Sequence, residues 1–596
     1  MSSLRKKYVV KQVGLPFNEL AVKYHTDPLI IRLMGNRNVP PEKMGDFLLP
    51  DWDMIENPYK LRDIKEGAEM LLSFIHSGKK IRVIGDYDID GIMSTYILTS
   101  VIRHLKGNVS YAIPNRVRDG YGLNERLIEE ALEDHIDLVI TCDNGIAARD
   151  AISLAREKGI HVIVTDHHAI PYEESDGERR ELLPEADFIV NPHREGDKSR
   201  FKEICGGVVA WKFCQVLSDL AGFDRTYVNG LIENAAFATV GDVMPLKEEN
   251  RAIVKLGIDK LKKTENIGMS CLIKAADLDP DNITSYTIGF VLGPMFNASG
   301  RLEDAKLGVE LLLSEDRARA EELSLRLKEL NAERKNMTEK GTKKALEEAE
   351  KFESDKVLVI YLPKETGVTE SVVGIVAGRV RESTGKPAFV LTDGENCVKG
   401  SGRSIPAYSM YDEMHKAEDL FLKYGGHTQA AGLSIEKENV DELRRRLNEE
   451  TSLTDDDLIE KIELDADMPL SYLSEDLIND LSLIEPFGQG NPRPLFGSRA
   501  RLLSIKTMGR EGQFLRFNFS LESGKTMNGV MFRNTDEARE KIIDAISREA
   551  FDDLMTGRRK RDVMISFTYY PAVNEYRGVR SLQAIVGDIV SVSYNG

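Results

Sequence analysis

The sequence predicts an α/β protein with two α/β lobes joined by a long helix and followed by a small β-barrel. Three observations predict this fold class. Apolar runs that end in polar motifs alternate with helical patterns in the first half of the chain. A stretch rich in Glu, Lys, Arg, Ala and Leu covers residues 314–352. Beyond residue 456, the alternation typical of strands replaces helical periodicity.

The most informative stretch is Ile81–Gly91, IRVIGDYDIDG. Its β-branched start predicts a buried strand, which three carboxylates on alternate positions follow: Asp86, Asp88 and Asp90. Aspartates are common in turns and at helix N-caps, which would account for one of them. Three of them beside a buried strand repel one another unless a cation lies between them. The stretch therefore favours a metal site.

The same arrangement recurs along the chain. Leu138–Thr141 leads into a motif that contains Asp143, and His161–Thr165 leads into Asp166, His167 and His168. The helical patterns between these runs predict βαβ units and a parallel sheet. Ligands of such sheets bind beyond the carboxyl ends of the strands. We therefore expect these Asp and His side chains at one edge of the sheet.

The ligand types narrow the choice of metal. Many carboxylates with one or two imidazoles, and no pair of thiolates, suit Mn²⁺ or Mg²⁺ better than zinc. The number of acids also exceeds what one cation needs. Two ions about 3.5–4 Å apart, bridged by a carboxylate and a water, would balance the charge and activate that water for attack on phosphorus.

The ordered motifs resemble those of a known family. GDYDIDG, CDNG, DHH and a later GDVMPL resemble the successive motifs of the DHH phosphoesterase superfamily, and GPMFNASGRL, KGSGRS and GGHTQAAG resemble its RecJ family. The resemblance runs in order through most of the chain. It implies an exonuclease that degrades single-stranded DNA from the 5′ end to mononucleotides, in DNA repair and recombination. It also implies that the two lobes are a DHH domain and a DHH-associated domain, and that the barrel is OB-like.

The resemblance assigns roles at the metal centre. The metal ligands would be Asp86, Asp88, Asp90, Asp143, His167 and Asp242. Asp143 would bridge the two ions, and Asp86 lies at the edge of the cluster. His168 would contact the scissile phosphate, while Asp166 would orient the imidazoles. Arg301 would offset the charge that develops on the phosphoryl oxygens.

A second group of residues is expected to bind substrate. From the residues alone, Arg116 on a glycine-containing loop is explained equally well as a phosphate site or as part of a solvated turn. The KGSGRS turn (Ser401, Gly402 and Arg403) is a credible anion-binding nest, with a flexible glycine hairpin as the less favoured alternative. The resemblance favours phosphate, with Arg116, Ser401 and Arg403 converging on a 5′-terminal phosphate across the cleft between the lobes.

Asn297 would orient a phosphodiester together with Arg301. The assignment of His427, in GGHTQAAG, rests on the resemblance alone. Two departures from the family pattern stand out. Met295 occupies a position where the family often has arginine, and Gly367–Glu370 lacks the histidine that the family commonly carries there.

The expected domains are a helical lead-in over 1–75, the DHH domain over 76–313, the connecting helix over 314–352, the DHH-associated domain over 353–455 and the strand-binding barrel over 456–596. We expect the helix to be interrupted at Gly341. Its leucines do not hold a heptad, which disfavours a coiled coil. In the barrel, alternation places Phe517, Phe519 and Phe567 in the core, and Phe514, Arg516 and Tyr570 outward.

The composition of the chain limits the classes of protein to which it can belong. A net charge of −18 over 596 residues argues against a protein that coats DNA indiscriminately, so the basic residues should be confined to a groove. Five scattered cysteines without a C-x-x-C motif indicate reduced thiols in a cytosol. No signal peptide or long apolar run is present. We expect a cytoplasmic monomer that binds single-stranded DNA and no membrane, with a single-strand-binding protein and a helicase as candidate partners.

Two other classes of function were weighed. A DHH phosphodiesterase acting on cyclic dinucleotides or very short RNA would use the same metals, but it usually needs no OB-like module. A vestigial scaffold protein of replication should have lost ligands, whereas this chain keeps its acidic and histidine motifs. The nuclease is therefore the favoured interpretation.

Overall fold

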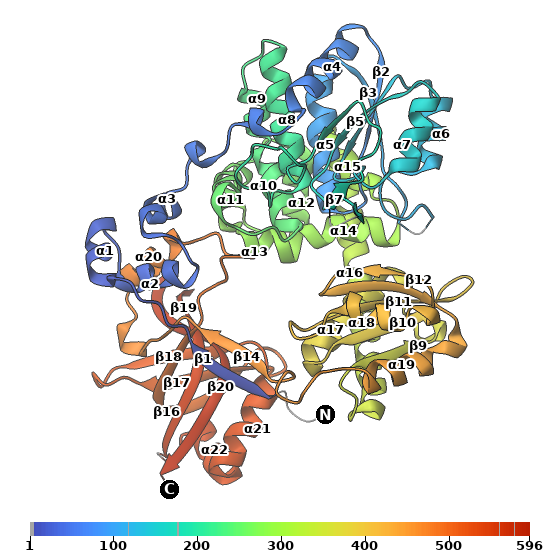
Figure 1. Cartoon of the computed structure of the whole chain (residues 1–596). Coiled ribbons are helices and arrows are strands. Elements are labelled where there is room, and N and C mark those ends of the chain that lie inside the picture. The colour runs from blue at the N-terminus through green and yellow to red at the C-terminus, as the bar shows by residue number, and fades with distance from the viewer. Residues whose placement is uncertain (1–4, 117, 176–177, 560, 577, 596) are drawn as a thin grey trace.

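The computed structural model describes residues 5–595 except 117, 176–177, 560 and 577. Figure 1 shows an α/β body at the top, a second α/β body below it and a β-barrel beside the second body. Helix α16 joins the two α/β bodies. This arrangement confirms the predicted fold class of two lobes, a connecting helix and a barrel.

The first body is built on a parallel sheet with strand order β3-β2-β4-β5-β8. Its strands are β2 (Lys80–Ile84), β3 (Asn108–Ala112), β4 (Leu138–Cys142), β5 (His161–Thr165) and β8 (Phe188–Val190). The chain leaves β2 on one side to form β3 and then returns to the other side to form β4. This reversal creates a switch point beside β2 and β4, where open α/β sheets bind their ligands.

Helices cover both faces of this sheet. One apolar core lies between the sheet and α4 (Ile64–His76), α5 (Ile89–His104) and α8 (Gly206–Leu220). The other lies between the sheet and α6 (Glu125–Glu133) and α7 (Arg149–Glu157). A short hairpin, β6 (Tyr172–Ser175) and β7 (Glu178–Glu181), is inserted after β5.

A helical layer completes the first body. It consists of α9 (Thr226–Gly230), α10 (Ile232–Gly241), α11 (Glu248–Leu261), α12 (Ile267–Ala275), α13 (Ser285–Thr287), a π-helical turn (Ile288–Leu292), α14 (Gly293–Leu302) and α15 (Lys306–Leu313). Helix α14 packs against α16, which links the site-bearing end of this body to the connecting helix.

The connecting helix α16 (Arg317–Ala349) is continuous and about 50 Å long. The interruption expected at Gly341 is absent from the structure. A Cβ atom at Gly341 would lie 2.9 Å from a methyl group of Val368 and 3.0 Å from one of Val376. The glycine therefore lets α16 pack closely against the second body instead of breaking the helix.

The second body has a mixed sheet with strand order β12-β13-β11-β10-β9. The strands are β9 (Leu358–Leu362), β10 (Ala388–Asp393), β11 (Val398–Arg403), β12 (Phe421–Gly426) and β13 (Ala430–Ile435). Its helices are α17 (Glu370–Thr384), α18 (Met410–Lys416) and α19 (Val440–Glu449). Helix α17 lies between α16 and the sheet, so α17 is covered from both sides.

The C-terminal strands close into a five-stranded barrel, because β16 pairs with both β17 and β19. The strands are β16 (Phe496–Met508), β17 (Phe514–Ser520), β18 (Thr526–Met531), β19 (Asp562–Tyr576) and β20 (Val579–Asn595), with helices α21 (Thr535–Ile546) and α22 (Arg548–Thr556) between β18 and β19. Phe517, Phe519 and Phe567 are fully buried, as predicted, and Phe519 stacks on each of the other two rings.

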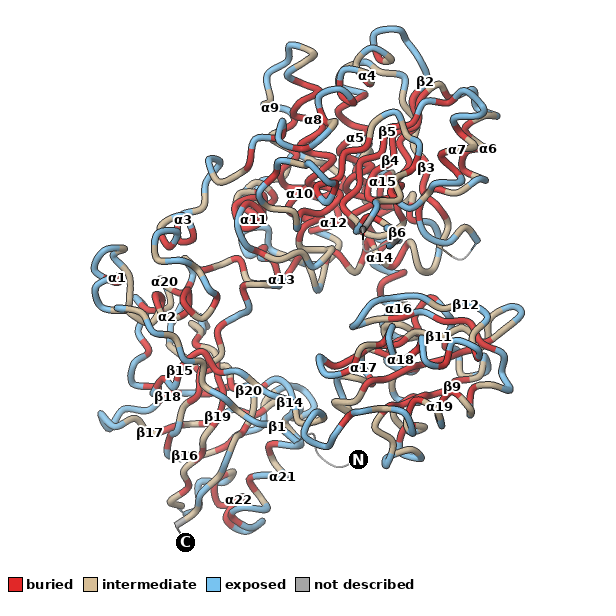
Figure 2. Tube along the Cα trace, viewed as in Figure 1, coloured by how far each residue is buried: buried red, intermediate tan, exposed pale blue. Residues whose placement is uncertain are grey.

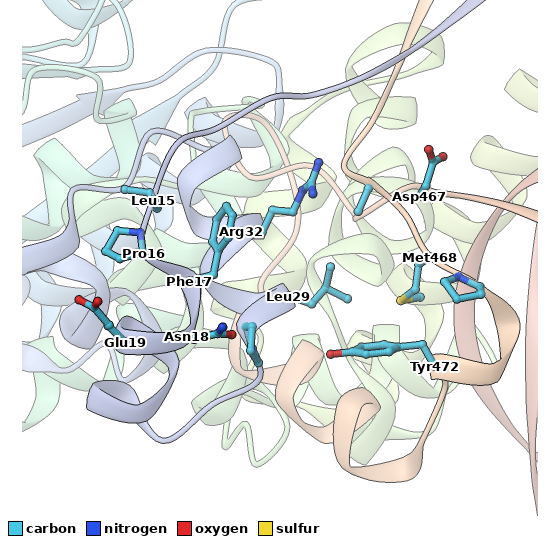
Figure 3. Close-up of a pocket in the computed structure, with 13 residues that line it drawn as sticks. Leu15, Pro16, Phe17, Asn18, Glu19, Leu29, Arg32, Asp467, Met468 and Tyr472 are labelled. Carbon is cyan, nitrogen blue, oxygen red and sulfur yellow. The ribbon is translucent and has the colours of Figure 1, made fainter.

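The N-terminal segment packs against the barrel. Strand β1 (Lys6–Val10) pairs in parallel with β14 (Glu460–Leu464), which precedes the short β15 (Ala466–Asp467) and α20 (Glu475–Leu483). Helices α1 (Phe17–Tyr24), α2 (Pro28–Asn36) and α3 (Met44–Leu48) share the barrel's apolar core. A cavity of about 540 Å³ remains between α1, α2 and β15, and Figure 3 shows Phe17 and Arg32 on one side and Tyr472 on the other.

One buried arginine ties the first body to both of these segments. Arg251, on α11, is fully buried and donates to the carbonyl oxygens of Phe47, Leu483, Ile484 and Glu485 at 2.8–3.0 Å. These four carbonyls belong to α3 and to the C-terminal end of α20. A single side chain thus satisfies backbone groups from two parts of the barrel module.

Each of the three bodies has its own buried residues. Figure 2 shows the buried residues concentrated in the strands and on the inner faces of the helices of each body. In the described part of the chain, no helix combines the length and the apolar character needed to cross a bilayer.

Arg251→Ala should loosen the barrel module from the first body. The carbonyl oxygens of Phe47, Leu483 and Glu485 would lose this donor, and that of Ile484 would keep only the side chain of Asn491, which is expected to cost about 3 kcal/mol or more. A lower unfolding temperature and faster proteolytic release of the barrel would report the change. The control is Arg225→Ala, which breaks an exposed pair with Asp219 and should cost at most about 1 kcal/mol. Equal effects of the two substitutions would contradict the tethering role.

Candidate metal centre and cationic pocket

The predicted ligands meet at the carboxyl ends of three neighbouring strands. Asp86 and Asp88 follow β2, Asp143 follows β4, and His167 follows β5. Strands β2, β4 and β5 are adjacent and parallel, so these residues lie at one edge of the sheet. Asp242, directly after α10, completes the group from the helical layer.

Backbone N–H groups fix two of the carboxylates. Asp88 is the N-cap of α5 and accepts hydrogen bonds from the backbone of Asp90 and Gly91. Asp90 accepts from the N–H groups of Gly206 and Gly207, both at 2.7 Å, at the start of α8. Side chains at these glycines would collide with the site, since a Cβ at Gly206 would lie 2.7 Å from that of Asp143. The glycine pair therefore lets a helix N-terminus reach the carboxylates.

His167 lies among three carboxylates. Its Nε2 is 3.2 Å from Asp143 Oδ1, 3.6 Å from Asp90 Oδ2 and 3.7 Å from Asp242 Oδ2. Burial lowers the pKa of His167, which favours the neutral imidazole with a free lone pair. This geometry fits a shared cation better than a set of ion pairs, because a neutral imidazole does not balance three carboxylates.

Three buried atoms of this cluster that could bind a metal have no hydrogen-bond partner among the described residues: Asp86 Oδ2, Asp143 Oδ1 and His167 Nε2. Burial, and then neighbouring carboxylates, raise the pKa of Asp86 and Asp143 well above the ordinary value, and that of Asp242 to about 8. Unpartnered buried acceptors of this kind need a cation or a proton.

The donor atoms form overlapping groups. Asp86, Asp88 and Asp143 make one group, and Asp90, His167 and Asp242 make another, each with its ligand atoms within 4.8 Å of one another. Asp143 also groups with the two histidines, so it lies between the two sets. Two cations sharing Asp143 fit this arrangement, and the oxygen-rich donors suit Mn²⁺ or Mg²⁺.

His168 is held in a different state. Burial would lower its pKa, but the hydrogen bond from Nδ1 to Asp166 Oδ1, at 2.8 Å, and the negative charges of Asp166, Asp90 and Asp242 together raise the pKa of His168 to about 9. Asp166 also accepts from the backbone N–H groups of His167 and Ile146. A single carboxylate therefore orients both histidines and keeps His168 cationic at neutral pH.

Tyr121 is a residue of the site that the sequence did not single out. Its hydroxyl donates to the carbonyl oxygen of Asp143 at 2.7 Å and lies 3.1 Å from the ring nitrogens of His168. Tyr87 packs edge-on against Tyr121, and Arg116 lies over the Tyr87 ring. The sequence around Tyr121 gave no signal for this contact, because only the fold brings Tyr121 to the end of β4.

Helix α14 supports the centre from outside. Asn297 Oδ1 accepts from the backbone N–H of Ile89 at 2.9 Å, and a Cβ at Gly300 would lie 2.3 Å from the carbonyl oxygen of Tyr87. In the structure, Asn297 therefore fixes the loop that carries Asp88. Met295, where the family often has arginine, is buried in the apolar core.

Arg301, near the end of α14, reaches the second body. Its Nη1 donates to the carbonyl oxygen of Ser371 at 2.9 Å, in the first turn of α17. Burial, followed by the neighbouring Arg116, lowers the pKa of Arg301 to about 10, so it remains cationic at neutral pH. At the position of the missing histidine, Thr369 directly precedes α17, and its hydroxyl lies 2.8 Å from that of Ser371.

A cavity of about 460 Å³ lies between the two α/β bodies. Arg116 and Arg301 line it from the first body, and Ser401 and Arg403 line it from β11 of the second. Arg403 Nη1 donates to Ser401 Oγ at 2.9 Å. Burial, and then Arg116, lower the pKa of Arg403. The fold thus brings together the three residues predicted to converge on a phosphate.

Two predicted substrate residues lie elsewhere. Gly402 faces the core of the second body, where a Cβ would lie 2.8 Å from the Phe389 ring and 2.9 Å from Met410 Sδ. His427 is exposed in the turn between β12 and β13, and its Nδ1 accepts from the backbone of Gln429. Among the described residues, neither lines the cavity between the bodies.

Comparison with known proteins agrees with this architecture. The family model of the DHH family, N-terminal domain, matches residues 80–239, that of the DHHA1 domain matches residues 354–452, and that of the RecJ OB domain matches residues 464–588. A crystal structure of RecJ in complex with Mn²⁺ from Thermus thermophilus is similar, with a TM-score of 0.80 and 26% identity over 98% of this chain and 79% of that chain.

Two curated relatives named single-stranded-DNA-specific exonuclease RecJ are similar over nearly the whole chain. The Bacillus subtilis (strain 168) protein is 32% identical over 588 residues, covering 96% of this chain and 72% of the relative. The Escherichia coli (strain K12) protein is 31% identical over 613 residues, covering 98% of each. With these matches and the geometry above, this chain belongs to the RecJ family of DHH phosphoesterases.

Proposed function

We propose that this protein is a metal-dependent exonuclease that hydrolyses the phosphodiester bonds of single-stranded DNA from the 5′ end and releases mononucleotides. The observation that carries the proposal is the pairing of a carboxylate–imidazole centre with a cationic cavity, both at the junction of the two α/β bodies. Arg301 belongs to both parts, since it extends from the helix that supports the centre and lines the cavity. The names of the relatives support the same activity.

The chain's own side chains suit attack on a phosphodiester. Asp86, Asp88, Asp90, Asp143, His167 and Asp242 would hold two divalent ions, which supply a nucleophilic water and offset negative charge on phosphorus when bound. His168, cationic through Asp166, would bind a phosphoryl oxygen of the scissile group. Arg301 would neutralise the charge that increases there in the transition state. Tyr121 would hold the His168 ring in place.

The cavity between the bodies would explain why the strand is degraded from its 5′ end. Arg116, Ser401 and Arg403 would bind the terminal 5′-phosphate, because arginine holds phosphate through two parallel hydrogen bonds. The distance from this group to the metal ligands would then select the first phosphodiester. A closed ring offers no terminal phosphate, which sets this substrate apart from cyclic dinucleotides.

The barrel would bind the rest of the strand by stacking and by contacts to the backbone. Phe514, at the start of β17, and the half-exposed Phe532, directly after β18, pack edge-on, and Arg516 on β17 is exposed. Tyr570, in contrast, is only partly exposed and lies under the guanidinium of Arg493 at 3.7 Å. We infer a cytoplasmic monomer in DNA repair and recombination, supplied with strands by a helicase and a single-strand-binding protein.

Asp143→Ala should reduce cleavage below about a tenth of the wild-type rate, which corresponds to ~1.4 kcal/mol of barrier. It removes the carboxylate between the two ligand groups. The pKa of this buried carboxyl is raised, so its removal should not lower the unfolding temperature of the metal-free protein. Asp137→Ala, at the other end of the same strand, is the control and should retain activity. A higher residual rate in Asp143→Ala would exclude Asp143 as the bridge.

Metal binding should release protons. The pKa of Asp242 in the folded protein is raised from 3.8 to about 8, and those of Asp86 and Asp143 are also raised, so the folded metal-free protein holds more protons than the unfolded chain. Its stability should therefore fall as the pH rises from about 4 to about 8. Mn²⁺ titrated near neutral pH should displace these protons.

Calorimetry of this titration in buffers with different ionisation enthalpies would count the protons. Asp242→Asn should release fewer of them. A metal-free protein that gains stability over this pH window would contradict the buried-carboxylate account.

A strand with a 5′-phosphate should be cut faster than its 5′-hydroxyl twin, and Arg403→Ala should remove the difference. The loss is expected to be about ten- to a hundredfold, since a charge-assisted pair contributes ~1.5–3 kcal/mol. Arg445→Ala, which changes an arginine on the exposed surface of α19, should keep the preference. If the unmutated enzyme degrades both strands equally, the assignment of the pocket is wrong.

A further inference from the structure

The cavity between the α/β bodies carries more positive charge than one terminal phosphate needs. Five cationic side chains line it: Arg116, Arg301, Lys399, Arg403 and Lys423. Within the part of the chain that the structure describes, none of the five forms an ion pair with a carboxylate. Glu370 is the one acidic side chain among the described residues that line the cavity. Unpaired cations gathered in a cavity indicate an anionic ligand.

The cationic side chains gather at two ends of the cavity, one around Arg403 and the other around Lys399. Successive residues of a strand point to opposite faces, so Lys399, Ser401 and Arg403 share one face of β11. Arg403 and Lys399 are four residues apart, which is about 13 Å along a strand. Arg116 and Arg301 reach the cavity from the body that holds the metal ligands. Arg403 therefore marks an arginine end, and Lys399 marks a separate lysine end.

The sheet register fixes the lysine end. Lys399 on β11 pairs with Ser434 on β13, and Ser434 pairs with Lys423 on β12. Lys399 Nζ donates to Ser434 Oγ at 2.9 Å. Lys399 and Lys423 thus stand on either side of Ser434 in one register row across three strands. This end resembles a site for an anionic group that is distinct from the one at Arg403.

Bare backbone lies between the two ends. Gly432 on β13 pairs with both Ser401 on β11 and Gly425 on β12. A Cβ added at Gly425 or at Gly432 would meet no atom within 4 Å. The sheet surface at Gly425 and Gly432, which forms the floor of the cavity, therefore stays open where side chains would otherwise fill the space. The whole cavity, about 460 Å³, corresponds to roughly fifteen times the ~30 Å³ that one water occupies in the liquid, far more than a single phosphoryl group fills.

The number of positive charges indicates what the lysine end binds. A phosphate monoester carries about −1.5 to −2 near neutral pH, which the arginine end alone would balance. The unpaired lysines would remain as a surplus. Each further phosphoryl group adds negative charge and extends the chain of phosphates along the open floor. Lysine binds phosphate as a point charge without a demand for planar geometry, which suits a flexible extension.

We propose that this cavity accepts a single strand whose 5′ end carries a triphosphate. The phosphate attached to the sugar lies at Arg116, Ser401 and Arg403, and the outer phosphates extend over Gly425 and Gly432 to Lys399 and Lys423. This inference rests on the proposed function and extends it to a further class of substrate. It assigns to the lysine end a role that the terminal monophosphate does not require.

The reaction itself is unchanged. Water adds to the phosphorus of the first phosphodiester, the bond from that phosphorus to the 3′-oxygen breaks, and the oxygen leaves with a proton. The first product is then a nucleoside 5′-triphosphate with a free 3′-hydroxyl. The shortened strand keeps an ordinary 5′-phosphate. No bond within the triphosphate breaks, because it lies on the side of the terminal nucleotide away from the metal ligands.

The test uses three DNA strands of one sequence that end in a 5′-hydroxyl, a 5′-phosphate or a 5′-triphosphate, with the full-length protein and Mn²⁺. The triphosphate strand should lose its first nucleotide faster than the hydroxyl strand. Mass spectrometry should identify the first product as an intact nucleoside triphosphate. In the double variant Lys399→Ala/Lys423→Ala, cleavage of the triphosphate strand should slow about tenfold, while that of the monophosphate strand changes less than about twofold.

The control is Lys416→Ala/Lys437→Ala, which removes the same charge from exposed positions of the same body and should change neither rate. The inference is overturned if the triphosphate strand is cut no faster than the hydroxyl strand, if pyrophosphate appears with the first product, or if the lysine variant slows both phosphorylated strands equally. A monophosphate strand that is left intact or cut from its 3′ end would instead overturn the proposed function.

Discussion

The mutual repulsion of carboxylates packed at one edge of a sheet is the constraint around which this molecule is arranged. Asp86, Asp90 and Asp143 are buried within the same crevice, with Asp88 and Asp242 beside them. Without compensation, each would have to hold a proton or leave the crevice. The surrounding structure supplies several partial compensations. The N–H groups at the start of α8 bind Asp90, and the first turn of α5 binds Asp88.

These compensations treat the two histidines of the site differently. Asp166 keeps His168 cationic, whereas His167 remains neutral with its Nε2 facing three carboxylates. One histidine is thus suited to act as a cation, and its neighbour in the chain is suited to act as a metal donor. The two rings differ in their partners, since Asp166 binds the ring of His168 but only the backbone of His167. Two adjacent, chemically identical residues acquire distinct roles through their partners.

Much of this site could be predicted from the sequence because strand ends are easy to locate. The apolar runs before Asp86, Asp143 and His167 indicated a shared sheet edge, and the order of the sheet confirms it. The same alternation placed Phe517, Phe519 and Phe567 in the barrel core. These patterns are local, so a short window of sequence carries them.

Contacts between distant segments could not be predicted in this way. Nothing around Tyr121 indicates that its hydroxyl reaches Asp143 and His168, and nothing around Asn297 indicates that it binds the backbone of Ile89. The interruption expected at Gly341 failed for a related reason. A glycine within a helix is unfavourable in isolation, but close packing of α16 on the second body compensates for it. Tertiary packing therefore overrode the local preference.

The pairing of β1 with β14 has a consequence for how the chain is made. Lys6–Val10 leaves the ribosome about 450 residues before its partner Glu460–Leu464, which is roughly 20–90 s at ~5–20 residues per second. During that time the first strand has an unpaired edge that could recruit another nascent chain. Its sequence, KKYVV, is short and begins with two lysines, which disfavour such pairing. The basic start of this strand therefore protects the protein during synthesis as well as stabilising it afterwards, when Lys6 pairs with Asp588.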